Sequence, residues 1–190
     1  MSSILSAVLG LSFAAGLNTY ATILALGVLQ RLGVVDLPTG LEILASVPVM
    51  IAAGFMYLVE FVADKIPYID SIWDAIHTVV RPAAGALLAY AAVGNVSPEW
   101  QMVAALAGGS VALTSHTAKA STRAAVNLSP EPFSNWTLSV IEDGLAFGLV
   151  WLIGTHPYIA TGAVIVLAAI AAFVIWKFSK FARRIFRRAA

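Results

Sequence analysis

The chain has 190 residues, of which 60% are hydrophobic and only 11% are charged, and its mean hydropathy is +0.89. A soluble domain carries about 25% charged residues, so this composition excludes an ordinary water-soluble domain and indicates a protein embedded in lipid. The net charge of +1 conceals an asymmetry, because six of the eleven Lys and Arg residues lie between Lys177 and Arg188, and the lack of cysteine excludes disulfides and thiolate metal sites.

The predicted fold class is all-α, a polytopic membrane protein of about six transmembrane helices. The first hydrophobic segment covers about residues 4–31, with a break expected at Gly16–Thr19, and the second covers 41–65 with a bend at Pro48. The third begins as an amphipathic stretch at 71–80 and then becomes apolar. Each segment approaches the ~20 residues that a bilayer span needs.

Three further segments follow the turn at residues 95–98. The fourth covers about 98–126, opens at a proline well placed for a helix start, and changes from apolar to polar at Thr114. The fifth covers about 135–155 and the sixth 157–176.

The six segments also predict a topology. Lys and Arg favour the cytoplasmic side of a membrane, and with both termini cytoplasmic every basic residue except Arg31 lies toward that side. We therefore expect one multi-pass domain at 1–176. Six spans divide into two sets of three, 1–94 and 98–176, which would have opposite orientations, as in transporters built from inverted repeats with broken helices.

Glu142 and Asp143 are adjacent carboxylates inside the apolar fifth segment. They lie about eight residues from its expected start, which places them ~12 Å deep, close to the middle of a hydrocarbon core about 30 Å thick. An ionised group at that depth costs ~3 kcal/mol, so it is expected to face a partner, a cavity or a pathway. Adjacent helical positions point about 100° apart, so the two residues are expected to face different neighbours.

Helical spacing groups other charged residues into faces. Glu60 and Asp64 are four residues apart on the second segment, while Lys119 and Arg123 belong to a stripe on the fourth that repeats every four residues. We expect these acids and bases to meet in one interior and to border an accessible hollow. Burial favours the protonated form of a carboxylate, so such a site could exchange protons or bind a charged solute. The alternative is a static network in which the bases only neutralise the acids.

A second stripe of mixed sign, Asp70, Asp74, His77 and Arg81, begins the third segment. The favoured interpretation is an amphipathic stretch at the membrane surface, with the intervening apolar side chains facing lipid. The alternative is that Arg81 caps the polar interior.

Asn18 and Thr19 would supply oxygen ligands if the first segment is unwound after Gly16, or they would make hydrogen bonds between helices. No metal-ligand spacing such as HExxH accompanies the histidines, so neither a metal site nor a cofactor is expected. The predicted substrate- or ion-binding residues are Asn18, Thr19, Glu60, Asp64, Arg81, His116, Lys119, Arg123, Glu142 and Asp143.

Residues 177–190 are predicted to form a basic amphipathic cytoplasmic tail. Its apolar side carries Phe178, Phe181, Ala182, Ile185 and Phe186, and its basic side carries Lys177, Lys180, Arg184 and Arg187. Such a helix suits anionic lipids, to which each cation contributes ~1 kcal/mol. A basic tail on a membrane protein does not argue for nucleic-acid binding. The sequence contains neither a glycine-rich phosphate loop nor a nucleophile elbow, so an enzyme is not expected.

Long strings of this sequence resemble an uncharacterised bacterial membrane family, the domain of unknown function 4126. The strings are GLNTYATILALG from Gly16, LVEFVADKIPYIDSIWDAIHTVVRPAAGA from Leu58, and HTAKASTRAAVNLSPEPFSNW from His116 followed by IEDGLA from Ile141. With the spans between them they cover nearly the whole chain. The resemblance implies an integral membrane protein, and we expect it in the bacterial cytoplasmic membrane; it implies no activity.

A weaker resemblance is to small cation exchangers built from two inverted three-helix halves, each with an acidic E-x-G-D motif. Residues 60–65 and 142–144 only approximate that motif, because the spacing differs in the first and is absent in the second. The resemblance slightly favours cation transport.

The leading hypothesis is a small transporter or channel-like protein coupled to protons or another cation, in which the acids bind the cation and the bases act as counter-charges or contact an anionic substrate. A homodimer is expected from the Gly- and Ala-rich helix faces. Two alternatives are a protein that binds or flips an anionic lipid through Arg81, Lys119 and Arg123, and a membrane scaffold without transport.

Overall fold

A computed structural model describes residues 2–66, 68–94, 96–128 and 132–189, and these residues form helices without any strand. The fold is therefore all-helical, as predicted. The elements are α1 (Ser2–Leu17), α2 (Thr19–Arg31), the 3₁₀ helix η1 (Thr39–Ala45), α3 (Val47–Ala63), α4 (Ile69–Ala92), α5 (Pro98–Val126), α6 (Pro132–Thr155) and α7 (Pro157–Ala189).

Three of the long helices begin at a proline, at positions 98, 132 and 157. Proline suits the first turn of a helix because its missing N–H would have no partner there and its fixed φ is already helical. The bounds of α5 agree with the fourth predicted segment. The helix α7 continues without a break through residue 177, so the predicted tail is the end of a long helix and not a separate element.

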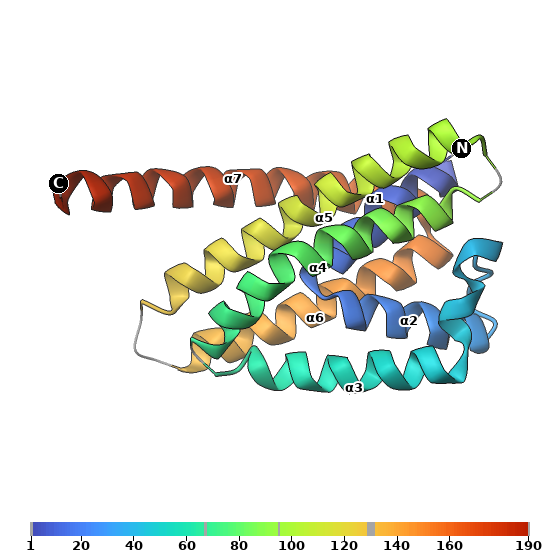
Figure 1. Cartoon of the computed structure of the whole chain (residues 1–190), viewed down its shortest axis with the longest axis horizontal. Coiled ribbons are helices and arrows are strands. Elements are labelled where there is room, and N and C mark those ends of the chain that lie inside the picture. Colours follow the sequence, from blue (N-terminus) through green and yellow to red (C-terminus); the bar gives the residue numbers. More distant parts are fainter. Residues whose placement is uncertain (1, 67, 95, 129–131, 190) are drawn as a thin grey trace.

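The first predicted segment is not one span. It breaks at Asn18, as expected, but the chain then reverses: Ile4 near the start of α1 and residues 34–38 beyond the end of α2 line the same cavity. Figure 1 shows α1 running from the N-terminal end of the molecule to its middle and α2 running back. The side chain of Asn18 accepts a hydrogen bond from Ala21 N, so it caps the new helix and fixes the position of the break.

The second predicted segment is bent, as the proline in it suggested. The helices η1 and α3 meet at an angle of 68° around Ser46, and Pro48 lies in the first turn of α3. The third predicted segment is one continuous helix, α4, which includes Pro82 in its interior.

Two described helices are long and apolar enough to cross a membrane, Phe133–Thr155 and Pro157–Arg184, and the bent pair η1–α3 makes up to three. The other long helices, α4 and α5, carry charged residues on their inner faces, and α1 is short. The apolar helices thus indicate a membrane protein. Six full spans and an inverted repeat are not confirmed: the described helices include two to three candidate spans, and the chain reverses at Asn18 within the first predicted segment.

The helix ends gather at two ends of the molecule. Figure 1 shows the end of α3, the starts of α4 and α6, and the end of α5 together on the left, while the end of α2, η1 and the start of α5 lie on the right. The labels N and C mark opposite ends. The prediction that both termini share one side of the membrane assumed an even number of crossings, and it stays a prediction.

Close approach of α4 and α5 depends on glycine. A Cβ at Gly108 would overlap Ala89 Cβ and stand 2.7 Å from Gly85 O, so these two positions let the helix backbones touch. At Gly16, a Cβ would overlap Ser115 Oγ and Ala112 O, which holds the end of α1 against α5. Small residues allow such packing where no water drives helices together.

Candidate functional site

A group of buried charged side chains lies between α3, α4, α5 and α6, and we call it the ionic network. Each member is at most 6% exposed to solvent. Its members are Glu60, Asp64, Asp70, Asp74, Arg81, Lys119, Arg123, Glu142 and Asp143.

Arg123 of α5 joins three helices. Its Nη2 lies 2.6 Å from Glu142 Oε2 of α6 and 3.1 Å from Asp64 Oδ2 beyond α3, and its Nη1 donates to Asp64 O at 2.6 Å. Asp70 Oδ2 of α4 lies 3.9 Å from Nη1. The planar guanidinium supplies several donors at fixed angles, which suits it to bridging carboxylates from different elements.

Lys119 lies one helical turn before Arg123 and contacts three acids. Its Nζ is 2.8 Å from Asp64 Oδ2, 3.4 Å from Glu142 Oε2 and 3.5 Å from Glu60 Oε1. It also donates to the carbonyl of Leu17 at 3.2 Å. The four-residue stripe predicted on this helix is therefore its inner face, and acids and bases meet in one interior as the spacing indicated.

Arg81 of α4 forms the inner end of the network. Its Nη2 donates to Glu60 Oε1 at 2.7 Å, and its Nη1 lies 2.8 Å from His116 Nδ1 and 3.2 Å from Asp74 Oδ1. Nη1 also donates to Gly16 O at 3.4 Å. Arg81 is fully buried, so it belongs to the polar interior.

The stripe from Asp70 to Arg81 was favoured as a membrane-surface segment, and that interpretation is wrong. Asp70, Asp74, His77 and Arg81 are at most 3% exposed, because they face α5 and α1 and not the headgroups. The intervening Ile72 and Ile76 are 63% and 58% exposed, as expected for an outer face. The same amphipathic pattern fits both arrangements, so spacing alone did not separate them.

The break at Asn18 places two helix ends beside the network. The free carbonyls at the end of α1, on Gly16 and Leu17, accept hydrogen bonds from Arg81 and Lys119. The C-terminal end of α1 is the negative end of its helix dipole, so the two cations lie where the dipole favours positive charge. On the other side of the break, Asn18 Nδ2 donates to Asp143 Oδ1 at 2.9 Å.

Glu142 and Asp143 face different neighbours, as their adjacent positions predicted. Glu142 pairs with the two bases of α5, whereas Asp143 accepts hydrogen bonds from Asn18 and, at 3.3 Å, from Tyr57 Oη. Thr19 is buried, but its hydroxyl donates to Ala15 O, so the structure places it outside the network.

Sequence reasoning missed some members. Asn127 Nδ2 donates to both oxygens of Asp70 at 2.9 Å, and Asn135 Nδ2 donates to Asn127 Oδ1, so two amides close the network where α5 ends. The four-residue spacing had already placed Asn127 on the same stripe as Lys119 and Arg123, so for this residue only its role in the site was missed. Tyr57 lies three residues before Glu60 on α3, but its uncharged side chain was counted among the apolar residues of the segment and was not singled out.

The network holds more acids than bases. Among the residues that the structure describes, six carboxylates and three cations are buried in it, and the half-buried Lys65 bonds Ser139 and Phe61 O instead of a carboxylate. Several carboxylate oxygens accept no hydrogen bond from any residue that the structure describes: Glu60 Oε2, Asp64 Oδ1 and both oxygens of Asp74. Asp74 Oδ1 lies 3.2 Å from Arg81 Nη1, but the angles are not those of a hydrogen bond, so we count that contact as an ion pair only.

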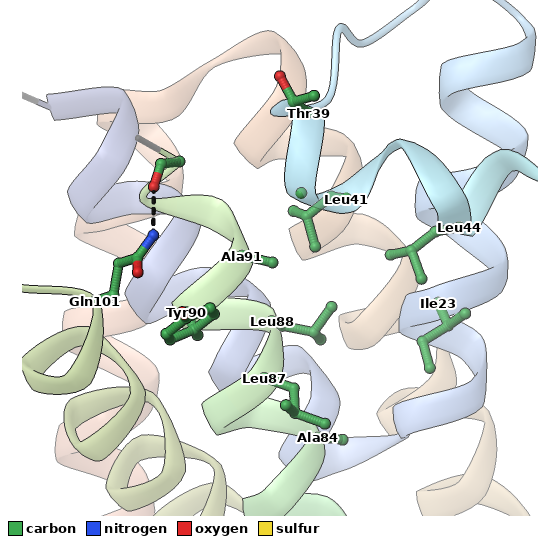
Figure 2. A pocket seen from close by; sticks show the side chains of 12 residues that line it. Ile23, Thr39, Leu41, Leu44, Ala84, Leu87, Leu88, Tyr90, Ala91 and Gln101 are labelled. Carbon is green, nitrogen blue, oxygen red and sulfur yellow. Dashed lines mark hydrogen bonds between the residues drawn. The ribbon is translucent and has the colours of Figure 1, made fainter. Parts of the chain in front are cut away.

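The predicted hollow is not among the larger cavities. A cavity of about 510 Å³ lies at the opposite end, between α2, η1 and α4, and Figure 2 shows Ile23, Leu41, Leu44 and Leu88 around it. No network carboxylate lines that cavity. His116, which touches Arg81, lines a smaller one of about 280 Å³. Within the described part of the chain, no three His, Asp or Glu side chains are placed to hold a metal ion.

Comparison with known proteins gives one match. A family model described as a domain of unknown function (DUF4126) matches residues 5–177, which include every member of the ionic network. No curated protein and no solved structure matches the chain.

Proposed function

The chain belongs to the family described as a domain of unknown function (DUF4126), and we propose that it is a small membrane transporter or channel-like protein that moves protons, alone or in exchange for a small cation, through the ionic network. The observation that carries this proposal is the excess of six buried carboxylates over three buried cations.

Buried charges need partners, and this network contains too few cations for its acids. A charged carboxylate without a partner in a low-dielectric interior costs about 5 kcal/mol unless it takes up a proton or binds a cation. The carboxylate oxygens without hydrogen bonds on Glu60, Asp64 and Asp74 are the positions available for this. Binding and release of protons at these oxygens is the elementary step of proton-coupled transport.

The two alternatives have less support. A scaffold held by static ion pairs accounts for the contacts of Arg123 and Lys119 but not for the surplus acids. A lipid-binding protein would present its cations to a headgroup, whereas Arg81, Lys119 and Arg123 are at most 3% exposed and already bound to carboxylates.

The broken helix supports the transport proposal. Helices interrupted inside a membrane occur in transporters because their free ends bind ions and substrates. Here the ends of α1 and α2 meet at Asn18, beside Asp143 and Lys119. The network is closed to the larger cavities, so the structure corresponds to an occluded arrangement in this proposal.

We further propose an arrangement in the bacterial cytoplasmic membrane. The basic residues Lys65 and Lys177–Arg188 favour the cytoplasm for the end of the bundle where α5 ends. The helices α3–α7 would then cross the membrane, with α1 and α2 entering from the other side. Association with anionic lipids and a homodimer remain predictions; Gly144, Gly148 and Gly162 have open space for a neighbouring helix.

Proton flux into liposomes tests the proposal. The purified protein is reconstituted with a trapped pH dye, and flux is driven by a potassium diffusion potential or by a pH gradient with Na⁺, Li⁺ or K⁺ added outside. We expect flux at least ten times that of empty liposomes under one of these conditions, and a fall of tenfold or more in Glu60→Gln and Glu142→Gln.

Glu99→Gln is the matched control, because Glu99 lies on the exposed first turn of α5 at the opposite end. Its flux should equal that of the unmodified protein. Flux indistinguishable from empty liposomes under all conditions, or flux that survives both substitutions in the network, would contradict the proposal.

A further inference from the structure

A small cavity on the outside of the bundle reaches the ionic network through one side chain. Its volume is about 280 Å³. It is lined by Thr78 of α4, by His116, Thr117, Ala120 and Ser121 of α5, and by Phe178 of α7.

This cavity has more polar lining residues than the cavity between α6 and α7. Four of its six lining residues carry a hydroxyl or imidazole group, whereas the cavity of about 670 Å³ between α6 and α7 is lined by glycine and aliphatic residues alone. The hydroxyls of Thr78 and Thr117 donate to backbone carbonyls of their own helices, and the oxygen of Thr117 can then accept a hydrogen bond from water. A water molecule in the cavity would therefore find hydrogen-bonding partners on its wall.

His116 forms the boundary between the cavity and the network. Arginine has no acceptor, so the 2.8 Å contact between Arg81 Nη1 and His116 Nδ1 requires Nδ1 to be the accepting nitrogen. The proton of the neutral ring is then on Nε2, which donates to Thr78 Oγ1 at 3.1 Å. One imidazole therefore contacts the cavity wall on one edge and, through Arg81, Glu60 on the other.

One wall of the cavity belongs to the part of α7 that carries lysines. Phe178 lines it, and its neighbours Lys177 and Lys180 are exposed, with Lys180 Nζ 3.9 Å from the centre of the Trp176 ring. Ammonium groups keep their charge in water or among headgroups while their stems lie along apolar surface. Phe178 therefore lines the cavity between two exposed lysines.

Building on the proposed function, we propose that this cavity is the aqueous entrance by which protons reach the ionic network, with His116 as its inner wall and Phe178 as its cover. The polar lining, the contact of His116 with Arg81 and the flanking lysines support the same route. The entrance opens at the end where α5 ends, which is the side that the basic residues assign to the cytoplasm.

Cysteine accessibility tests the entrance without requiring transport, because the native chain has no cysteine. We would introduce Ala120→Cys inside the cavity and, as a control, Leu113→Cys, which is 43% exposed on the outer surface of the same helix. The probe is a membrane-impermeant trimethylammonium methanethiosulfonate applied to reconstituted protein. We expect labelling of Ala120→Cys to be at least tenfold faster than that of Leu113→Cys.

The cover is tested in the Ala120→Cys background. Phe178→Ala should accelerate labelling severalfold, whereas Phe181→Ala, on the same helix and 45% exposed, should leave the rate unchanged. Equally slow labelling of Ala120→Cys and Leu113→Cys would overturn the entrance, whatever the flux measurements show.

Flux then links the entrance to the network. Labelling of Ala120→Cys should lower the proton flux at least fivefold, and labelling of Leu113→Cys should not. Rapid labelling of Ala120→Cys with unchanged flux would overturn the inferred route while the proposed function stands. Absence of flux before labelling would instead contradict the proposed function, and with it the role of the cavity for protons.

Discussion

The same two helices line a polar end and an apolar end of this molecule. The polar end is the half that contains the ionic network; the apolar end is the half around the cavity in Figure 2. On α4, the inner face changes from the stripe ending at Arg81 to Gly85, Leu88 and Ala92, and on α5 it changes from Ala112 to Ser115. The chemistry of the interior therefore switches at one level of the bundle.

The two ends hold their helices together by different means. At the apolar end, Gly85, Gly108 and Ala112 let the backbones of α4 and α5 touch, so stability depends on shape. At the polar end, Arg81, Lys119 and Arg123 span the gaps between helices, so stability depends on charge. A polar end with incomplete charge pairing is suited to take up ions, and a tightly packed apolar end is suited to hold the frame.

The largest expected effect is the loss of Arg123. Arg123→Ala leaves Asp64 and Glu142 buried without their closest cation, and breaking a buried ion pair in this way costs about 3–5 kcal/mol. Arg31→Ala at the apolar end removes only an exposed hydrogen bond to Ala45 O and should cost less than about 1 kcal/mol. Thermal unfolding in detergent measures both, and equal losses would show that the polar end does not depend on charge.

A smaller effect is expected from overfilling the apolar end. Gly108→Ala places a Cβ on Ala89 and Gly85, and such overpacking costs about 1–3 kcal/mol. Gly162→Ala is the control, because nothing lies within 4 Å of its Cβ, and the better helix propensity of alanine should stabilise α7 by up to ~1 kcal/mol. The same unfolding measurement applies. If Gly108→Ala is harmless, the close contact of α4 and α5 is not what holds this end.

The junction between the two ends gives the third prediction. Asn18→Ala removes both the cap of α2 and the hydrogen bond to Asp143, and should lower the free energy of unfolding by about 1–2 kcal/mol. Asn18→Asp keeps the cap but adds a carboxylate 2.9 Å from another, so it should be at least as harmful. A stable Asn18→Asp variant would show that Asp143 is already protonated or that the break can move.

The stripes, the bounds of α5 and the position of the break could be predicted from the sequence. Spacing of four residues identifies one face of a helix wherever that face is buried, so Lys119 and Arg123 were found together with Glu60 and Asp64. The break was visible because Gly16, Asn18 and Thr19 interrupt an apolar run.

Other features could not be read in this way. The hydropathy of a segment depends on its composition and not on the direction of the chain. It is therefore the same whether the second helix continues in the direction of the first or turns back, and the reversal at Asn18 was missed. The same amphipathic pattern fits a helix on the membrane surface and a helix that faces a polar interior. Asp70 and Asp74 were therefore predicted at the membrane surface, although they are buried. Tyr57 was missed because a tyrosine in an apolar segment counts as a hydrophobic residue, whereas here its hydroxyl reaches Asp143.

The smallest expected effect has the opposite sign and bears most directly on the surplus of acids. Asp74 is 3% exposed and neither of its oxygens accepts a hydrogen bond from a described residue, so its charge adds to a network that contains fewer cations than acids. Asp74→Asn removes that charge with little change of shape and should leave the protein unchanged or more stable by about 1 kcal/mol near neutral pH. Asp64→Asn is the control for Asp74→Asn. It should lower the free energy of unfolding by about 3 kcal/mol, because Asp64 pairs with both Lys119 and Arg123. Losses of similar size in the two variants would mean that Asp74 is an essential counter-charge of Arg81, so that the network has fewer surplus acids than the geometry indicates.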